Sequence, residues 1–254
     1  MKNLIVLLAL AVSGSVYADG VTTLRIADQK GNMRAQLEAS GLLKNLPFHI
    51  EWAEFPAAAP LAEALNAGAV DAGIIGDAPL LFSIAAGSQV KAIAVDKSDP
   101  IGTAIVVNKD STLHSAADLK GKSIGTGRGS IGHLVALKAL AQAGIKAEDV
   151  RFRYLTPGDA KIALASGAID AWATWDPYTA LAETSGIGRV LVNGQGLIAG
   201  NSFLAATDSA LGNAEKRQAL QQYVNLLAHA EQLAYNNIDG YSATLAHIIG
   251  FPQQ

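Results

Sequence analysis

The sequence predicts an α/β fold of two lobes, each a mixed, mainly parallel sheet flanked by helices. Runs of β-branched residues alternate with Ala/Leu-rich helical runs along most of the 254 residues, as in parallel sheets covered on both faces. In addition, "GAVDAGIIGDAP" at 68–79 returns as "GAIDAWATWDPY" at 167–178, and an Ala/Leu-rich run precedes each copy. We therefore expect two related halves, each of which ends a strand with a polar turn.

The chain begins with the pattern of a secretory signal peptide. Lys2 gives a positive start, "LIVLLALAV" an apolar core, and Val16 and Ala18 the small residues before a cleavage point at Asp19. The apolar core is too short to span a bilayer, so an uncleaved anchor helix is the less favoured alternative. The sequence predicts a signal peptide over 1–18.

Composition narrows the class of protein. Half of the residues are hydrophobic, 16% are charged, and the net charge is −3. The chain has no cysteine, which excludes disulfides, thiol catalysis and a lipoprotein anchor. It has no basic cluster, so nucleic acid is not an expected partner. These features are typical of a monomeric protein of the bacterial periplasm.

Each element follows from local patterning. Period-2 and β-branched runs predict strands at 23–28, 49–55, 70–76, 90–96, 102–108, 122–127, 150–155, 169–175, 189–194 and 203–208. Helical runs lie near 32–44, 58–67, 78–86, 130–143, 158–166, 177–185, 213–237 and 241–249. "SAADLKGK" at 115–122 predicts a short capped helix that Gly121 closes.

The chain is expected to cross between the two lobes twice. We assign 19–105 and 203–254 to the first lobe and 106–202 to the second. The strand at 102–108 would carry the chain across, and the segment 195–203 would bring it back. Ligands of open α/β sheets sit beyond the carboxyl ends of the strands, where this chain has "DQKG", "GDAP", "TGRGSIGH" and "WDPY". All four turns should line one cleft between the lobes.

The turn "TGRGSIGH" at 126–133 has the features of an anion site. Gly127 and Gly129 permit a nest of backbone amides, and Ser130 is suited to cap a helix that begins at Ile131. The helix dipole favours an anion there, and Arg128 offers a bidentate contact to an oxyanion. A plain N-cap with a solvent-facing arginine is the equally weighted alternative. The turn is not a Walker P-loop, because it lacks the Lys-Ser/Thr pair.

The other turns offer weaker signals. Asp77 is an N-cap candidate, so amides near it are better ligand donors than its carboxylate. Gln29 offers an amide donor, and Gly31 allows close approach of the backbone. We expect Trp175 to form a wall of the cleft and Trp172 to pack in the core.

A histidine on the first turn of the predicted helix is better explained by structure than by catalysis. His133 has no partnered nucleophile in the sequence. The residues alone therefore predict a helix-facing structural side chain.

Together, "LRIADQKG", "EWAEFPAAAPLAEALNAGAVDAGIIGDAP", "AADLKGKSIGTGRGSIGHLVALKALAQAG" and "DAWATWDPY" resemble the periplasmic aliphatic-sulfonate-binding proteins of ABC importers. The wider superfamily also binds taurine, nitrate and thiamine precursors. The resemblance implies a type II periplasmic binding protein fold that closes on its ligand and docks on a permease in the inner membrane. It also implies a sulfonate held at Gln29, Asp77, Ala78, Gly129, Ser130, Ile131, His133, Trp175 and Asp176.

The chain departs from the family pattern at several points. Arg128 and Ile131 stand where the family commonly has lysine and serine, and Asp28 adds an acid beside the expected anion. Family members usually run several tens of residues further, so helices that pack back on the first lobe are expected to be missing.

The function expected from the resemblance is capture of aliphatic sulfonates for sulfur acquisition, without a cofactor, metal or catalysis. The alternatives are another small anion such as taurine or nitrate, or an enzyme acting on a thiamine precursor. A sulfinate desulfinase is excluded because it needs a nucleophilic cysteine.

Overall fold

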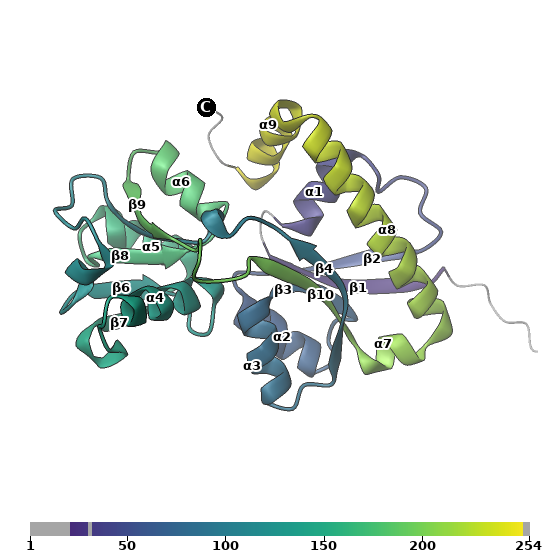
Figure 1. Cartoon of the computed structure of the whole chain (residues 1–254). Helices are drawn as coiled ribbons and strands as arrows, with labels where there is room; N and C mark the ends of the chain where they lie inside the picture. Colours follow the sequence, from purple (N-terminus) through teal and green to yellow (C-terminus); the bar gives the residue numbers. More distant parts are fainter. Residues whose placement is uncertain (1–20, 30–31, 251–254) are drawn as a thin grey trace, which may run out of the picture.

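The computed structural model describes residues 21–29 and 32–250. The predicted signal peptide and Gly31 lie outside this part of the chain. Two five-stranded sheets lie side by side and are flanked by helices (Figure 1). Among the described residues, no helix is long and apolar enough to cross a membrane.

The first sheet has the order β2-β1-β3-β10-β4. Its strands are β1 (Thr23–Gln29), β2 (His49–Phe55), β3 (Ala72–Gly76), β4 (Val90–Lys97) and β10 (Asn201–Thr207). β1 is parallel to β2 and β3, and β10 is antiparallel to β3 and β4, so four strands run one way. The helices of this half are α1 (Met33–Ser40), α2 (Ala58–Asn66), α3 (Asp77–Ala85), α7 (Asp208–Gly212), α8 (Ala214–Asn236) and α9 (Ile238–Ile249).

The two faces of the first sheet carry separate apolar cores. One core contains Leu24 and Ile26 of β1 together with residues of α1 and α8. The other contains Ala27 of β1 and residues of α2 and α3. In Figure 1, α8 and α9 lie above this sheet and α2 and α3 below it. Alternate residues of one strand thus face opposite helix layers, as a strand requires.

The second sheet repeats this plan with the order β7-β6-β8-β5-β9. Its strands are β5 (Ala104–Asn108), β6 (Ser123–Thr126), β7 (Arg151–Tyr154), β8 (Ala171–Thr174) and β9 (Gly188–Asn193). Its helices are α4 (Ile131–Gln142), α5 (Pro157–Ala165) and α6 (Tyr178–Thr184), with short 3-10 helices at Ala116–Leu119 and Ala147–Asp149. A further 3-10 helix, Pro100–Gly102, lies in the segment that leads into β5. Here β5 is the antiparallel strand, which corresponds to β10 of the first sheet. The predicted fold of two related halves is confirmed.

Two segments carry the chain between the sheets. Residues 98–103 lead from β4 to β5, and residues 194–200 lead from β9 to β10. They are bonded to each other, because the amide and the hydroxyl of Ser98 donate to the carbonyl of Gly200 at 3.2 and 3.0 Å. Gly200 has a φ of 75°, and a Cβ there would lie 2.5 Å from the Ser98 carbonyl oxygen. The crossing therefore precedes the strand predicted at 102–108, which begins at Ala104 within the second sheet.

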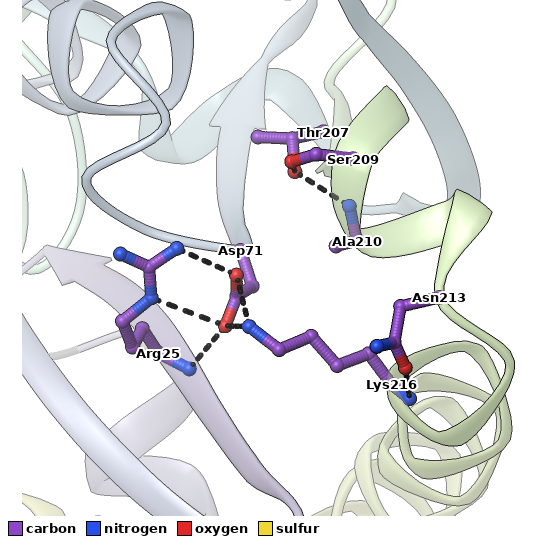
Figure 2. Close-up of polar contacts among 7 residues, drawn as sticks. All are labelled: Arg25, Asp71, Thr207, Ser209, Ala210, Asn213 and Lys216. Carbon is purple, nitrogen blue, oxygen red and sulfur yellow. Dashed lines mark hydrogen bonds and ion pairs between the residues drawn. The ribbon is translucent and has the colours of Figure 1, made fainter.

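Asp71 ties α8 to the first sheet (Figure 2). Its carboxylate is buried and accepts hydrogen bonds from the Arg25 guanidinium at 2.8 Å and from the Lys216 ammonium at 2.8 Å. Burial alone would raise the pKa of Asp71, but the bonds from Arg25 and Lys216 lower it overall. The long helix predicted near 213–237 is thereby fixed to the strand that starts the fold.

A few elements differ from the sequence predictions. α1 ends at Ser40 rather than near 44, because Gly41 adopts a left-handed conformation with a φ of 70°. The capped helix predicted at 115–122 is a single 3-10 turn, held by a reciprocal bond between Ser115 and Asp118. α7 was not expected, and it forms because the Thr207 hydroxyl caps it by accepting from the Ala210 amide.

Candidate functional site

A cavity of about 350 Å³ lies between the two halves at the carboxyl ends of β1, β3 and β8. Its walls come from strands and helix starts of the first half, from the start of α4 and the turn after β8 in the second half, from the two crossing segments and from α9. The lining residues are Gln29, Asn32, Ala58, Ile74, Ile75, Gly76, Pro79, Asp96, Ser98, Asp99, Pro100, Gly102, Thr103, Ser130, Ile131, Trp175, Asp176, Pro177, Gly200, Asn201, Ser202 and Leu245.

The start of α4 forms one part of the wall. Ser130 caps the helix as predicted, with its hydroxyl accepting from the His133 amide at 3.2 Å and its carbonyl from the Leu134 amide at 3.1 Å. The amides of Ile131 and Gly132 are left without a protein acceptor among the described residues. A Cβ on Gly132 would lie 2.6 Å from the Ala173 carbonyl oxygen, so glycine lets α4 begin directly against β8.

The start of α3 lies opposite, in the other half. Gly76 is the N-cap residue, so the N-cap predicted at Asp77 is wrong by one position. The reason is that Gly76 is the last extended residue, with ψ at 162°, and Asp77 already belongs to the helix. Gly76 and Pro79 line the cavity, whereas Asp77 and Ala78 do not. The Asp77 carboxylate instead accepts from the Ala78 amide at 2.7 Å.

The two helix starts meet across the cavity. A Cβ on Gly76 would lie 4.0 Å from the Cβ of Ile131, so the backbones of the two turns approach closely. The N-terminus of a helix carries partial positive charge and unpaired amide donors. Two such ends at one point make this part of the cavity suited to an anion.

The "WDPY" turn supplies the opposite half's aromatic wall. Trp175 lines the cavity, and Trp172 is only 1% exposed within the core, as predicted for both. Tyr178 packs against both indoles, with ring centroids 6.1 Å from Trp175 and 6.2 Å from Trp172. Asp176 is also on the wall, where its carboxylate accepts from the Ala180 amide at 3.1 Å and the surrounding protein raises its pKa.

At the end of β1, neighbouring residues face different surroundings. Gln29 lines the cavity, and its side-chain amide lies 3.5 Å from the Ile74 carbonyl. Asp28 was expected beside the anion, but it is not on the cavity wall. Its side chain is 2% exposed and accepts from the Arg34 amide at 3.3 Å. Burial raises the pKa of Asp28 to about 7.

Arg128 does not line the cavity, in contrast to its predicted role. Its guanidinium stacks over the Tyr154 ring, 3.8 Å from the centroid. This cation–π contact stabilises the guanidinium without a bound anion. This arrangement matches the second alternative for the turn, a helix cap with a solvent-facing arginine, rather than an arginine placed at the anion.

His133 and Gly129 support the same turn from outside the cavity. The Gly129 amide donates to His133 Nδ1 at 3.2 Å, and the imidazole packs edge-on against Phe152 and Tyr154. Burial and the nearby Arg128 lower the pKa of His133. Gly129 has a φ of 68°, which glycine adopts without strain. These residues hold the start of α4 in place.

Charge along the wall is negative. Asp96, Asp99 and Asp176 line the cavity, and no lysine or arginine does so among the described residues. Asp96 is the penultimate residue of β4 and the last residue of the strand predicted at 90–96, so its place at a strand end is the signal that could have identified it. The sequence carries no such signal for Leu245 and Asn201, because they reach the cavity from distant segments of the chain. Among the described residues, no group of histidine and acidic side chains is arranged to hold a metal.

Comparisons with known proteins agree with this architecture. An Escherichia coli (strain K12) relative named for binding aliphatic sulfonates is 38% identical over 261 residues, which cover 99% of this chain and 81% of the relative. The alkanesulfonate-binding protein of Xanthomonas axonopodis pv. citri bound to MOPS has a TM-score of 0.83 at 35% identity, over 91% of this chain and 80% of that one.

A second solved structure gives the same result. The periplasmic aliphatic sulphonate binding protein of Escherichia coli has a TM-score of 0.78 at 37% identity, over 92% of this chain and 80% of that one. The resemblance seen in the turns is thus confirmed. A family model described as NMT1-like matches residues 31–250. The chain belongs to the NMT1-like family.

Proposed function

We propose that this chain is a periplasmic solute-binding protein that captures an aliphatic sulfonate and delivers it to an ABC permease for sulfur acquisition. The observation that carries the proposal is the pair of helix starts, at Gly76 and at Ile131, which meet at one cavity between two lobes. The names of the similar proteins support the same ligand class. We further propose that the chain is exported by its signal peptide and acts as a monomer.

The size and polarity of the cavity favour an organic anion over an inorganic one. Its volume of about 350 Å³ is at the lower end of ligand pockets, and a water molecule takes about 30 Å³ of liquid. A bare anion would leave most of this space to water. Trp175, Ile131 and Leu245 provide apolar surface that an alkyl tail would cover.

Binding needs no chemical step at this site. Amides and helix dipoles stabilise a sulfonate that stays ionised at all physiological pH values. The Ser130 hydroxyl is used as a helix cap, and the His133 Nδ1 accepts from the Gly129 amide. Neither is arranged as a nucleophile with its base.

Calorimetry of the purified mature protein tests the proposal. We expect saturable binding of ethanesulfonate and butanesulfonate, and no comparable binding of sulfate or nitrate. Tight binding of nitrate alone, or conversion of any of these compounds to a product, would refute it.

A proline at the first helical position tests the anion site directly. Ser130 has a φ of −75° and ψ of 168°, which are favourable before proline, and helices tolerate proline at this position. Ile131→Pro removes one amide donor, and Ile131→Ala removes the side chain but keeps the donor. We expect Ile131→Pro to bind ethanesulfonate at least tenfold more weakly than Ile131→Ala, with an unchanged circular dichroism spectrum. Equal affinities would show that this amide does not bind the anion.

The acidic wall favours a second candidate, an aminoalkanesulfonate such as taurine. Asp96, Asp99 and Asp176 would attract an ammonium group on the ligand tail. Comparison of taurine with ethanesulfonate in the same calorimeter decides between the two, because the compounds differ by one amino group.

A further inference from the structure

We infer that Leu245 of α9 limits the length of the alkyl tail that the cavity accepts. This inference rests on the proposed sulfonate-binding function. Leu245 is half-buried, lies on the cavity wall, and is contributed by a helix close to the end of the described chain. None of the turns that carry the family resemblance includes it.

α9 is held in place by contacts that do not depend on a ligand. Asn237 caps the helix, with its side chain accepting from the Gly240 amide at 3.2 Å. α9 then packs against α1 and α8 (Figure 1). Asn32, which immediately precedes α1, also lines the cavity. Leu245 therefore belongs to a wall that is already formed in the first half.

The cavity has two distinct ends. The starts of α3 and α4 meet on one side, and α3 packs on the same face of the first sheet as α2. α9 lies with α1 and α8, which cover the opposite face of that sheet. A ligand whose sulfonate sits at the helix starts must extend past the sheet edge toward α9. Its tail then ends against Leu245.

An apolar branched side chain at that position acts on the tail alone. Each further methylene that leaves water gains about fourfold in affinity, as long as space remains. Where the tail meets Leu245, further methylenes gain nothing and begin to collide. The head group, at the other end, makes the same contacts whatever the tail length.

The test is an affinity series from methanesulfonate to octanesulfonate, measured by calorimetry on the wild type, L245A and L245W. In L245A we expect the longest chain that still gains affinity to increase by about one or two methylenes, because the substitution opens space in the wall. In L245W that limit should shorten, with octanesulfonate losing at least tenfold. Methanesulfonate should bind all three within about twofold.

A matched control is available on the neighbouring helix. Leu233 of α8 is 48% exposed and lies outside the cavity, so L233A should keep the wild-type length profile. An unchanged profile in L245A, with wild-type binding of alkanesulfonates, would overturn this inference and leave the proposed function intact. Absence of alkanesulfonate binding in the wild type would overturn both. If L245W fails to fold, L245A and L233A still decide the matter.

Discussion

Asp71 and Asp170 make the same contact in the two halves of the molecule. Each occupies the fourth position of the repeated segment, and each carboxylate accepts from a backbone amide of the adjacent parallel strand, β1 or β6. Asp71 accepts from the Arg25 amide at 2.9 Å, and Asp170 from the Ser123 amide at 2.7 Å. Both also donate their own amides back to the same residues, at 2.8 and 3.1 Å. Asp71 thus links β1 to β3, and Asp170 links β6 to β8, which are the second and third strands in the spatial order of each sheet.

The two links differ in charge, which predicts unequal effects on stability. Asp71→Asn would leave Arg25 and Lys216 facing a neutral amide, so we expect a loss of about 3 kcal/mol in the free energy of unfolding. Asp170→Asn is the matched control, because its side-chain partner is the neutral Ser123 hydroxyl. For Asp170→Asn we expect a loss of about 1 kcal/mol in the free energy of unfolding. Urea unfolding of both variants provides the measurement, and equal losses would contradict the argument.

Because Asp28 is buried and has a raised pKa, we expect the stability of the fold to depend on pH. Burial raises its pKa from 3.8 to about 7, so between about pH 4 and pH 7 the folded chain holds a proton that the unfolded chain has released. The free energy of unfolding therefore falls as the pH rises through this window. Asp28→Asn keeps an oxygen for the Arg34 amide and removes the titration. The difference in the free energy of unfolding between Asp28→Asn and wild type should therefore rise in favour of the variant by up to about 4 kcal/mol between pH 4 and pH 8.

Urea unfolding across that pH range checks the sign. Glu63→Gln, at an exposed position of α2, controls for a carboxylate-to-amide change on the surface. A difference between Asp28→Asn and wild type that stays constant with pH would show that Asp28 does not titrate in this window.

The stacking of Arg128 on Tyr154 predicts a small effect on ligand affinity. Arg128→Ala should change ethanesulfonate binding by less than about 0.5 kcal/mol and lower stability by about 0.5–1 kcal/mol. Arg153→Ala removes a charge from the same strand as Tyr154 and serves as the control. A tenfold loss of affinity in Arg128→Ala alone would mean that the guanidinium leaves Tyr154 to meet the anion.

The fold was predictable because its signals are local and repeated. Alternating strand and helix patterns placed nearly every element, and the copies at 68–79 and 167–178 pointed to two related halves, whose sheets have equivalent strand orders in the structure. Ser130 as a helix cap and Trp175 as a wall followed from their places beside a strand end. In such cases the residue type and the next few residues decide the conformation.

The other features of the site depend on tertiary contacts, which cannot be recognised from the sequence. The partner of Arg128 is Tyr154, on a different strand, and spacing along the chain does not reveal that pair. Asp28 and Gln29 are adjacent, yet only Gln29 reaches the cavity, because successive residues of a strand face opposite sides. Leu245 enters the site only through the packing of α9 on α1.

The position of β10 also sets an order of assembly. The second sheet uses strands that are contiguous in the chain, from Ala104 to Asn193, whereas the first sheet needs β10 inserted between β3 and β4. Pairs distant in sequence form slowly, and a ribosome delivers the N-terminal half first. Until β10 is available, β3 and β4 therefore have open edges, which are templates for wrong pairing. The half of the molecule that is made first is the half that is completed last.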